Sequence, residues 1–270
     1  MSDRGPDTLP EPVSLGLRHY ATFVVTWMMV AVVIYGLLVV FWLVRLFEWP
    51  FGRPVTPDIT RLASRTSLRL MGIRLSVRGT PMRMAGATVA NHVSWLDILV
   101  MNSHQRVFFV AKSEISRWFG IGVLARTTGA VFIERDRRQA RQQRSRFIKR
   151  FLRGDTLLFF PEGTSTDGLR VLSFKPTLFA AMFDDRLRDR LHVQPATVNY
   201  RAPPGQDRRF YGFWGEMALA GHMLKVLATG ERGSVELVYH EPVAVSRFDD
   251  RKSLASYCEQ VVRSGHQGQH

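Results

Sequence analysis

Apolar and polar residues are arranged in two different ways along this chain. Residues 21–44 contain no charged side chain, and most of their positions are apolar. From about residue 54 onward, short apolar runs alternate with stretches in which apolar residues recur at helical spacing. The first pattern is typical of a membrane-associated segment and the second of an α/β domain.

The second region is predicted to fold as a mixed sheet covered by helices. The short apolar runs predict strands at residues 74–77, 87–90, 107–110, 130–133, 156–160, 192–199 and 234–239. Helical spacing predicts helices at residues 95–103, 113–124, 137–152, 177–183, 217–227 and 252–262. The chain then divides into a polar tail at 1–19, a membrane anchor at 20–48 and one folded domain at 49–265.

The uncharged segment is long enough to cross a membrane, because a span needs about 20 apolar residues. It starts too late and runs too long for an ordinary cleaved signal peptide. Two arrangements stay open: a single spanning helix, or a hairpin bent at Gly36 that lies in one leaflet. Arginines are more numerous after the segment than before it, so the positive-inside rule places the folded domain in the cytoplasm.

Charge and cysteine content narrow the range of partners. The formal net charge of the 270 residues is +14, which favours an anionic partner such as acidic lipid or a phosphorylated substrate. Nucleic acid is not expected, because the chain lacks a nucleic-acid-binding motif. Cys258 is the single cysteine, so neither an internal disulfide nor a cysteine-based metal site is expected.

Residues 137–153 contain the main concentration of positive charge. Four apolar residues interrupt the basic ones, namely Phe147, Ile148, Phe151 and Leu152. The pattern fits a basic amphipathic helix on anionic lipid, and it fits equally a solvated helix whose apolar residues pack on the sheet. An acidic carrier protein is a further candidate partner of this helix.

The candidate chemistry centres on the segment NHVSWLD at residues 91–97, directly after a predicted strand. Histidine accepts a proton near neutral pH, and a carboxylate on its other ring nitrogen would orient it and stabilise the imidazolium. His92 and Asp97 are five positions apart, so they can meet only if the chain turns between them. Ser94 and Asp97 have the spacing of a capping box, which would provide that turn. Alternatively, Asp97 only caps a helix and His92 is an ordinary loop residue.

Three later segments place polar groups at the ends of predicted strands, where open α/β sheets usually bind ligands. They are GAVFIERD at residues 129–136, FPEGTSTDG at residues 160–168 and VQPATVNY at residues 193–200. Backbone N–H groups near Gly163 and Thr164 are candidates for holding an oxyanion or a phosphate. Arg135 is a candidate partner for phosphate. Taken singly, each feature also has a structural explanation as a turn glycine, a helix cap or a surface charge.

Taken in this order, the four segments resemble the four motifs of the glycerolipid acyltransferase family, which includes bacterial 1-acyl-glycerol-3-phosphate acyltransferases. The NHxxxxD motif matches residues 91–97, the glycine-to-arginine strand matches 129–135, FPEGT matches 160–164, and the fourth motif matches the strand around Pro195. The resemblance covers roughly residues 75–200 and implies the family's α/β acyltransferase fold at residues 49–265, behind an N-terminal membrane anchor.

The resemblance implies transfer of a fatty acyl group from a thioester to the hydroxyl of a lysolipid at a bacterial inner membrane. His92 would be the general base and Asp97 would orient it. The acceptor site would be shaped by Glu162, Gly163 and Thr164, and Arg135 would hold an anionic headgroup. The donor would be a thioester of acyl carrier protein or of coenzyme A. Neither a cofactor nor a metal is expected, because the thioester is already activated.

One departure from the family pattern bears on the acceptor. Many members that acylate phosphate-bearing acceptors have arginine directly after EGT, where this chain has Ser165. Serine offers one weak donor in place of a bidentate phosphate clamp. The runs EGTSTDG at 162–168, VLSFKP at 171–176 and YGFWGEM at 211–217 resemble the lyso-ornithine lipid acyltransferase branch. Arg135 and Lys175 could still serve a phosphate, so both acceptors stay open, 1-acyl-glycerol-3-phosphate and lyso-ornithine lipid.

Two other functional classes are weaker interpretations of the same sequence. A thioesterase or esterase would need a nucleophilic serine, and Ser94 lies beside His92, but the chain has no GxSxG elbow. A basic membrane adaptor without enzymatic activity would need only the anchor and residues 137–153, and it would leave the four motifs unexplained.

Overall fold

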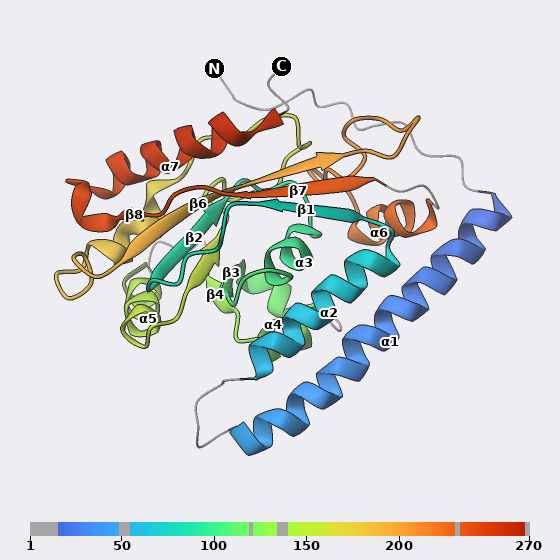
Figure 1. Ribbon diagram of the computed structural model, residues 1–270, viewed down its shortest axis with the longest axis horizontal. Coiled ribbons are helices and arrows are strands. Elements are labelled where there is room, and N and C mark those ends of the chain that lie inside the picture. Colours follow the sequence, from blue (N-terminus) through green and yellow to red (C-terminus); the bar gives the residue numbers. More distant parts are fainter. Residues whose placement is uncertain (1–15, 49–54, 119–120, 134–139, 230–232, 268–270) are drawn as a thin grey trace.

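The computed structural model describes residues 16–48, 55–118, 121–133, 140–229 and 233–267 (Figure 1). These residues form an eight-stranded sheet with the strand order β1-β7-β6-β2-β5-β3-β4, in which β8 pairs with β6. The strands are β1 (Arg74–Arg78), β2 (Gly86–Ala90), β3 (Phe108–Lys112), β4 (Val131–Ile133), β5 (Leu157–Phe159), β6 (His192–Arg201), β7 (Ser234–Tyr239) and β8 (Val243–Ala244).

The sheet is mixed, as predicted. Strand β6 runs antiparallel to β7 and to β8, and the other neighbouring strands are parallel. Strand β2 lies inside the sheet between β5 and β6, and each of its five residues is buried. Since the segment at residues 91–97 follows β2 directly, it starts from a position that is fixed on both sides.

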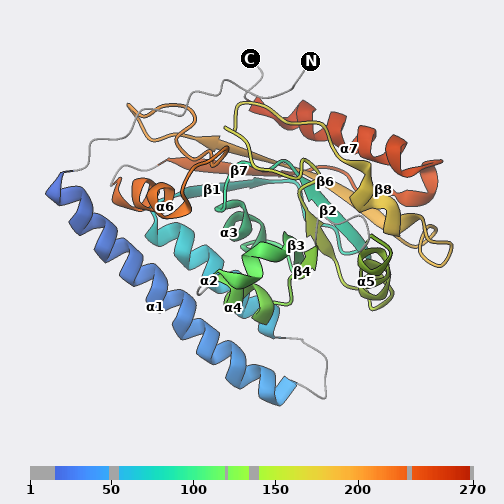
Figure 2. The ribbon, with the colours of Figure 1, turned by 180° about the vertical axis from the view of Figure 1, so that it is seen from behind.

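Helices cover both faces of the sheet (Figures 1 and 2). One face packs against α2 (Thr56–Leu70), α3 (Asp97–Asn102) and α6 (Leu219–Ala228). The other packs against α5 (Ala140–Leu152), the 3-10 helix η4 (Pro176–Phe183) and α7 (Arg251–Gly265). Shorter elements are η2 (Ser113–Arg117), α4 (Ile121–Thr127) and η5 (Val245–Arg247). Each face has its own apolar core, because side chains alternate along a strand.

The uncharged segment forms one long helix, α1 (Leu17–Glu48), which lies along α2 and also contacts α6 (Figures 1 and 2). It runs unbroken through Gly36, so the alternative of a hairpin bent at that residue is wrong. The helix is long and apolar enough to cross a membrane, and only 11% of its most apolar window is buried. Water would solvate these exposed apolar side chains poorly, whereas lipid would accept them.

The basic helix packs on the sheet. Within α5, the side chains of Phe147, Ile148 and Phe151 are each at most 5% exposed and belong to the core beside α7 and η4. The alternative of a solvated helix with its apolar residues on the sheet is therefore confirmed, because these side chains are not available to a lipid surface. Of the four apolar residues, only Leu152 is exposed.

Several predicted elements differ from the structure. Helix α2 was not predicted, because its sequence is rich in serine, threonine and arginine, and its buried positions include Ser64 and Ser67. The helix expected at residues 113–124 is divided between η2 and α4, and the one expected at 177–183 is a 3-10 helix. The two-residue strand β8 was also not predicted.

Candidate active site

His92 and Asp97 meet at the start of α3. The distance from His92 Nδ1 to Asp97 Oδ2 is 2.7 Å, which confirms the predicted turn between them. The Asp97 side chain is fully buried, and 23% of the His92 side chain is exposed. A histidine whose Nδ1 is bonded to a carboxylate keeps its other nitrogen, Nε2, for a substrate proton.

The Asp97 carboxylate has four hydrogen-bond partners. Oδ2 accepts the backbone N–H groups of Val93 and Ser94 at 2.8 and 3.0 Å, in addition to the His92 ring. Oδ1 accepts the hydroxyl of Tyr200 at 2.8 Å. Burial and the Asp97 charge hold the pKa of Tyr200 well above its usual value, so this hydroxyl stays a donor. Asp97 is thus fixed from two sides before any substrate binds.

Only half of the predicted capping box forms. The Asp97 carboxylate accepts the Ser94 N–H, but the Ser94 hydroxyl is buried and has no hydrogen-bond partner in the described part of the chain. Helix α3 accordingly begins at Asp97 and not at Trp95. Because the Ser94 side chain is fully buried, it is also badly placed for a nucleophile, which disfavours a serine esterase.

The main chain and the ring of His92 are held by residues 160–172. Its N–H donates to Glu162 Oε1 at 2.7 Å, and its carbonyl accepts the Thr166 N–H at 2.9 Å. The imidazole stacks on the Phe160 ring, with 4.1 Å between centroids and 8° between planes. Phe160, Glu162 and Thr166 therefore hold the ring, the N–H and the carbonyl of His92 in place.

Glu162 faces inward. It is 1% exposed, and its second oxygen, Oε2, accepts the Leu172 N–H at 2.9 Å. Burial raises the pKa of Glu162 to about 8, while the two backbone donors act in the opposite direction. The sequence suggested that Glu162 shapes the acceptor site, whereas in the structure its carboxylate joins the His92 loop to the segment around Leu172.

The turn at Gly163 lies beside Lys175. Gly163 has a φ of 74°, which favours glycine, and a Cβ there would lie 2.7 Å from the Lys175 Nζ. The Gly163 N–H donates to the Phe160 carbonyl at 3.1 Å, and the expectation that backbone N–H groups near Gly163 and Thr164 hold an oxyanion or a phosphate stays a prediction. Thr164 is exposed next to this turn. The Lys175 ammonium is therefore the cation that the structure places at the EGT turn.

The Ser165 hydroxyl has a hydrogen-bond partner within the protein. Its hydroxyl donates to the backbone carbonyl of Phe213. The other predicted headgroup residue, Arg135, lies outside the described residues, so the structure does not place it. Of the second motif, the structure describes Gly129 and strand β4 up to Ile133.

Sequence reasoning missed several residues that support the pair. Tyr200 lies 103 positions from Asp97, and only its place at the end of the fourth motif could have drawn attention to it. Asn91 was noted as part of the first motif, but its task was not foreseen. Its side-chain amide bonds both the N–H and the C=O of Val198 and thereby ties the end of β2 to β6.

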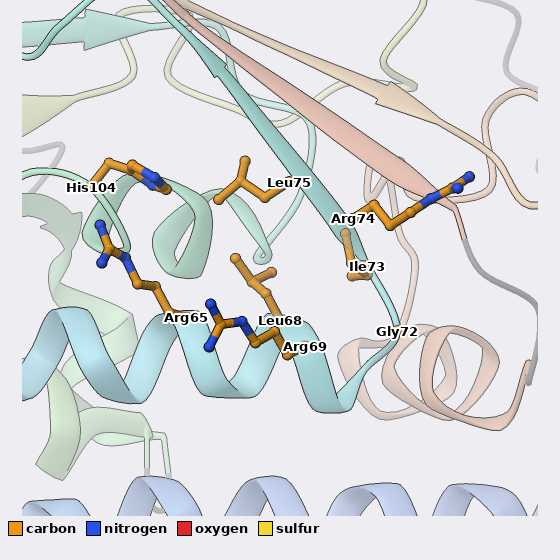
Figure 3. Close-up of a pocket in the computed structure, with 8 residues that line it drawn as sticks. All are labelled: Arg65, Leu68, Arg69, Gly72, Ile73, Arg74, Leu75 and His104. Atoms are coloured by element: carbon orange, nitrogen blue, oxygen red, sulfur yellow. The ribbon is translucent and has the colours of Figure 1, made fainter.

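A cleft of about 690 Å³ lies between α2, β1 and His104, just beyond the last turn of α3, and neither His92 nor Asp97 lines it (Figure 3). Its lining residues are Arg65, Leu68, Arg69, Gly72, Ile73, Arg74, Leu75 and His104. No carboxylate is among them. Arg65 Nε donates to the carbonyl of Ser103, just beyond the end of α3, at 2.7 Å.

The arrangement at His92 suits acid–base chemistry. A base oriented by a buried carboxylate, with one ring nitrogen free, can take a proton from a hydroxyl that attacks a carbonyl. No group of three or more His, Cys, Asp or Glu side chains is placed to hold a metal in the portion of the chain that is described.

Comparisons with known sequences agree on one family. The family model described as Acyltransferase matches residues 77–199. The chain is 52% identical over 225 residues to a lyso-ornithine lipid O-acyltransferase of Rhodobacter capsulatus. The aligned region covers 82% of each protein. A protein of the same name from Rhizobium meliloti is 35% identical over 74% of this chain and 71% of its own.

Two further comparisons concern enzymes with a phosphate-bearing acceptor in their names. A 1-acyl-sn-glycerol-3-phosphate acyltransferase of Neisseria gonorrhoeae is 39% identical over 44% of this chain and 48% of its own. The crystal structure of the 1-acyl-sn-glycerophosphate acyltransferase PlsC of Thermotoga maritima matches with a TM-score of 0.65, over 93% of this chain and 95% of that one. At 22% identity, this second likeness establishes the fold alone.

Proposed function

This chain belongs to the glycerolipid acyltransferase family, and on that premise we propose that it transfers a fatty acyl group from an acyl thioester to the hydroxyl of a lyso-ornithine lipid. The main support for this reaction is the oriented base: His92 Nδ1 is hydrogen-bonded to the buried Asp97 carboxylate at 2.7 Å. The acceptor is inferred from the relative that is 52% identical over 82% of both chains.

In the proposed mechanism, His92 Nε2 takes the proton of the acceptor hydroxyl as its oxygen attacks the thioester carbonyl. Asp97 stabilises the imidazolium. The Tyr200 hydroxyl and the backbone N–H groups of Val93 and Ser94 keep the Asp97 carboxylate in place. The new C–O bond forms, the C–S bond breaks, and the proton passes from the imidazolium to the thiolate that leaves. His92 returns to its neutral form without a covalent intermediate on the protein.

The headgroup is proposed to bind near the EGT turn. An ornithine headgroup carries a carboxylate and an ammonium, and the Lys175 ammonium beside Gly163 is suited to pair with the carboxylate. Arg135 is retained as a second candidate cation, and Thr164 as an exposed polar contact. The thioester donor is proposed to be acyl carrier protein or coenzyme A, both of which are anionic and suit a chain of net charge +14.

The enzyme is proposed to act at the cytoplasmic face of a bacterial inner membrane. Helix α1 supplies the apolar surface for membrane association, with its exposed side chains along most of its length. Four arginines, at positions 45, 53, 61 and 65, follow the apolar segment, which favours a cytoplasmic domain.

A second acceptor, 1-acyl-glycerol-3-phosphate, has one observation in its favour. The Lys175 ammonium at the EGT turn would serve a phosphate as well as a carboxylate. Against it, the Ser165 hydroxyl is engaged by Phe213 and is not available to a phosphate.

An acyl-transfer assay in liposomes tests the proposal. The purified enzyme would receive lyso-ornithine lipid and lysophosphatidic acid side by side, each with acyl carrier protein and with coenzyme A thioesters. We expect lyso-ornithine lipid to be the better acceptor. We also expect His92→Ala to lose at least about a thousandfold in kcat and Asp97→Asn at least about a hundredfold. A preference for lysophosphatidic acid would overturn the acceptor, and normal turnover by His92→Ala would overturn the mechanism.

A further inference from the structure

A short aromatic segment crosses the two loops that hold the candidate base, and the proton transfer makes no use of it. We name residues 210–214 (FYGFW) the aromatic strap. It lies in the chain between β6 and α6, and none of its residues carries a charge. Phe210 and Tyr211 are each 3% exposed, whereas Phe213 and Trp214 are half-buried.

One residue of the strap bonds to both loops. The Phe213 N–H donates to the Val93 carbonyl at 2.9 Å, directly after His92. The Phe213 carbonyl accepts the hydroxyl of Ser165, directly after the EGT turn. The strap therefore bridges the loop of the base and the loop of the proposed headgroup site.

The strap also lies against the EGT loop backbone to backbone. A Cβ on Gly212 would lie 2.8 Å from the carbonyl oxygen of Asp167 and 2.9 Å from its carbonyl carbon. Real Cβ atoms do not approach backbone so closely, so a side chain at this position would push the strap away. Glycine at position 212 is thus required for the observed contact.

Ring contacts pack the strap against Tyr200 and His222. The Tyr211 ring packs on Tyr200, the donor to Asp97, with 5.3 Å between centroids. The Phe213 ring packs at 5.3 Å on His222, which in turn accepts the Trp95 indole N–H through Nδ1 at 3.0 Å. Burial, aided by the Lys225 charge, lowers the pKa of His222 to about 4, so this ring is neutral and able to accept.

The side chain at position 165 points at the strap. Because the Ser165 hydroxyl bonds the Phe213 carbonyl, a longer side chain in the same direction would run into that peptide group. Only a small residue lets the strap close over the loop. The strap itself carries no charge and the serine donor is already used, so neither of them offers a phosphate a partner in place of the water that it would lose.

We propose that the aromatic strap, closed by the Ser165–Phe213 hydrogen bond, is the wall that selects the acceptor and rejects a lysolipid bearing a phosphate. This inference rests on the proposed function, because it explains how an acyltransferase with an unchanged base prefers a phosphate-free headgroup. It assigns the discrimination to Ser165, Gly212 and Phe213, none of which takes part in the proton transfer.

The test compares the acceptor preference of four full-length variants in liposomes. Ser165→Ala removes the hydroxyl, Gly212→Ala pushes the strap from Asp167, and Ser165→Arg both opens the strap and adds a cation. The matched control is Gly221→Ala, because a Cβ at this glycine of α6 meets no atom within 4 Å. The readout is the ratio of kcat/KM for lyso-ornithine lipid to kcat/KM for lysophosphatidic acid.

We expect the ratio to fall about threefold to tenfold in Ser165→Ala and in Gly212→Ala, as for the loss of one hydrogen bond, and further in Ser165→Arg. Turnover of lysophosphatidic acid should persist or rise in Ser165→Ala, because that change leaves the bond from the Phe213 N–H to the loop of the base in place. Gly221→Ala should keep the parent ratio. If the parent protein prefers lyso-ornithine lipid and the three strap variants retain its ratio, the inference is wrong although the proposed function stands. If the parent protein does not use lyso-ornithine lipid, the proposed function itself fails.

Discussion

The two ends of helix α3 differ in whether their charged side chains have hydrogen-bond or ion-pair partners within the protein. At the first end, Asp97 has four hydrogen-bond partners within the protein, and the His92 beside it is held through its ring and its main chain. At the other end, the cleft holds three arginines and no acid (Figure 3). Arg69 and Arg74 form no ion pair with any residue that the structure describes.

The His92 end is thus a prearranged site, whereas the cleft is a charged surface. Groups that act on a substrate gain from being fixed in advance, because no free energy is then spent on ordering them during the reaction. Exposed arginines on the cleft are solvated by water and need no partner. We therefore expect substitutions at the His92 end to cost much activity and those at the cleft to cost little.

Outside the His92–Asp97 pair itself, the largest expected effect is that of Glu162→Gln. Both oxygens of Glu162 accept a backbone N–H, from His92 and from Leu172, and an amide would turn its NH2 group toward one of these donors. The His92 loop should shift, and kcat should fall about a hundredfold in the liposome assay. Glu259→Gln is the matched control, because Glu259 also accepts a backbone N–H, that of Phe174, but does not contact His92. An equal loss in both variants would mean that the effect is one of folding.

The same variant should change how stability depends on pH. The folded-state pKa of Glu162 is about 8, above the ordinary 4.5, so the folded protein holds the proton more tightly than the unfolded chain does. Its contribution is then greatest below about pH 4.5 and is lost as the pH rises toward 8, by a few kcal/mol at about 1.4 kcal/mol per unit. Melting temperatures of the detergent-solubilised enzyme between pH 5 and 8.5 should fall in the parent and fall less steeply in Glu162→Gln.

The spacing of residues in the sequence predicted that His92 and Asp97 form a pair, but it did not predict the hydrogen bonds that hold the pair in place. His92 and Asp97 are close in sequence, so a single turn brings them together, and the turn could be anticipated from Ser94. The bond from Tyr200 depends on β6 lying beside β2, which is a property of the sheet and not of any local pattern. For the same reason, the inward direction of Glu162 could not be inferred from the EGT motif alone.

Sequence patterns also could not decide which apolar helix faces are buried in the protein. Helix α1 and helix α5 both had the composition of membrane-binding segments, and the fold exposes the apolar side chains of the first and buries most of those of the second. Helix α2 escaped prediction because it buries serines in place of aliphatic residues. Strands β3, β5 and β7 were easier to place, because short runs rich in valine, leucine and phenylalanine favour strands wherever they lie in a sheet.

We expect an intermediate effect for Tyr200→Phe. Phenylalanine keeps the ring and leaves Asp97 Oδ1 buried without its donor, which costs about 1–3 kcal/mol. We expect kcat to fall about tenfold with KM nearly unchanged, as for a group that acts through the base and not on the substrate. Tyr239→Phe is the matched control, because the Tyr239 hydroxyl is buried without a hydrogen-bond partner among the described residues. A loss of kcat in Tyr239→Phe as large as in Tyr200→Phe would contradict the assigned role.

The smallest expected effect is that of the double substitution of Arg69→Gln and Arg74→Gln in the cleft. Both side chains are exposed, so their removal should change kcat less than about twofold on neutral liposomes. Arg65 and Arg69 are four residues apart on α2, and like charges at this spacing repel, so the free energy of unfolding should stay the same or rise by up to about 0.5 kcal/mol. Arg65→Gln should instead destabilise the protein, because it removes the donor to Ser103 at the end of α3. A loss of activity in the double variant as large as that of Tyr200→Phe would show that the cleft is part of the working site and not only a charged surface.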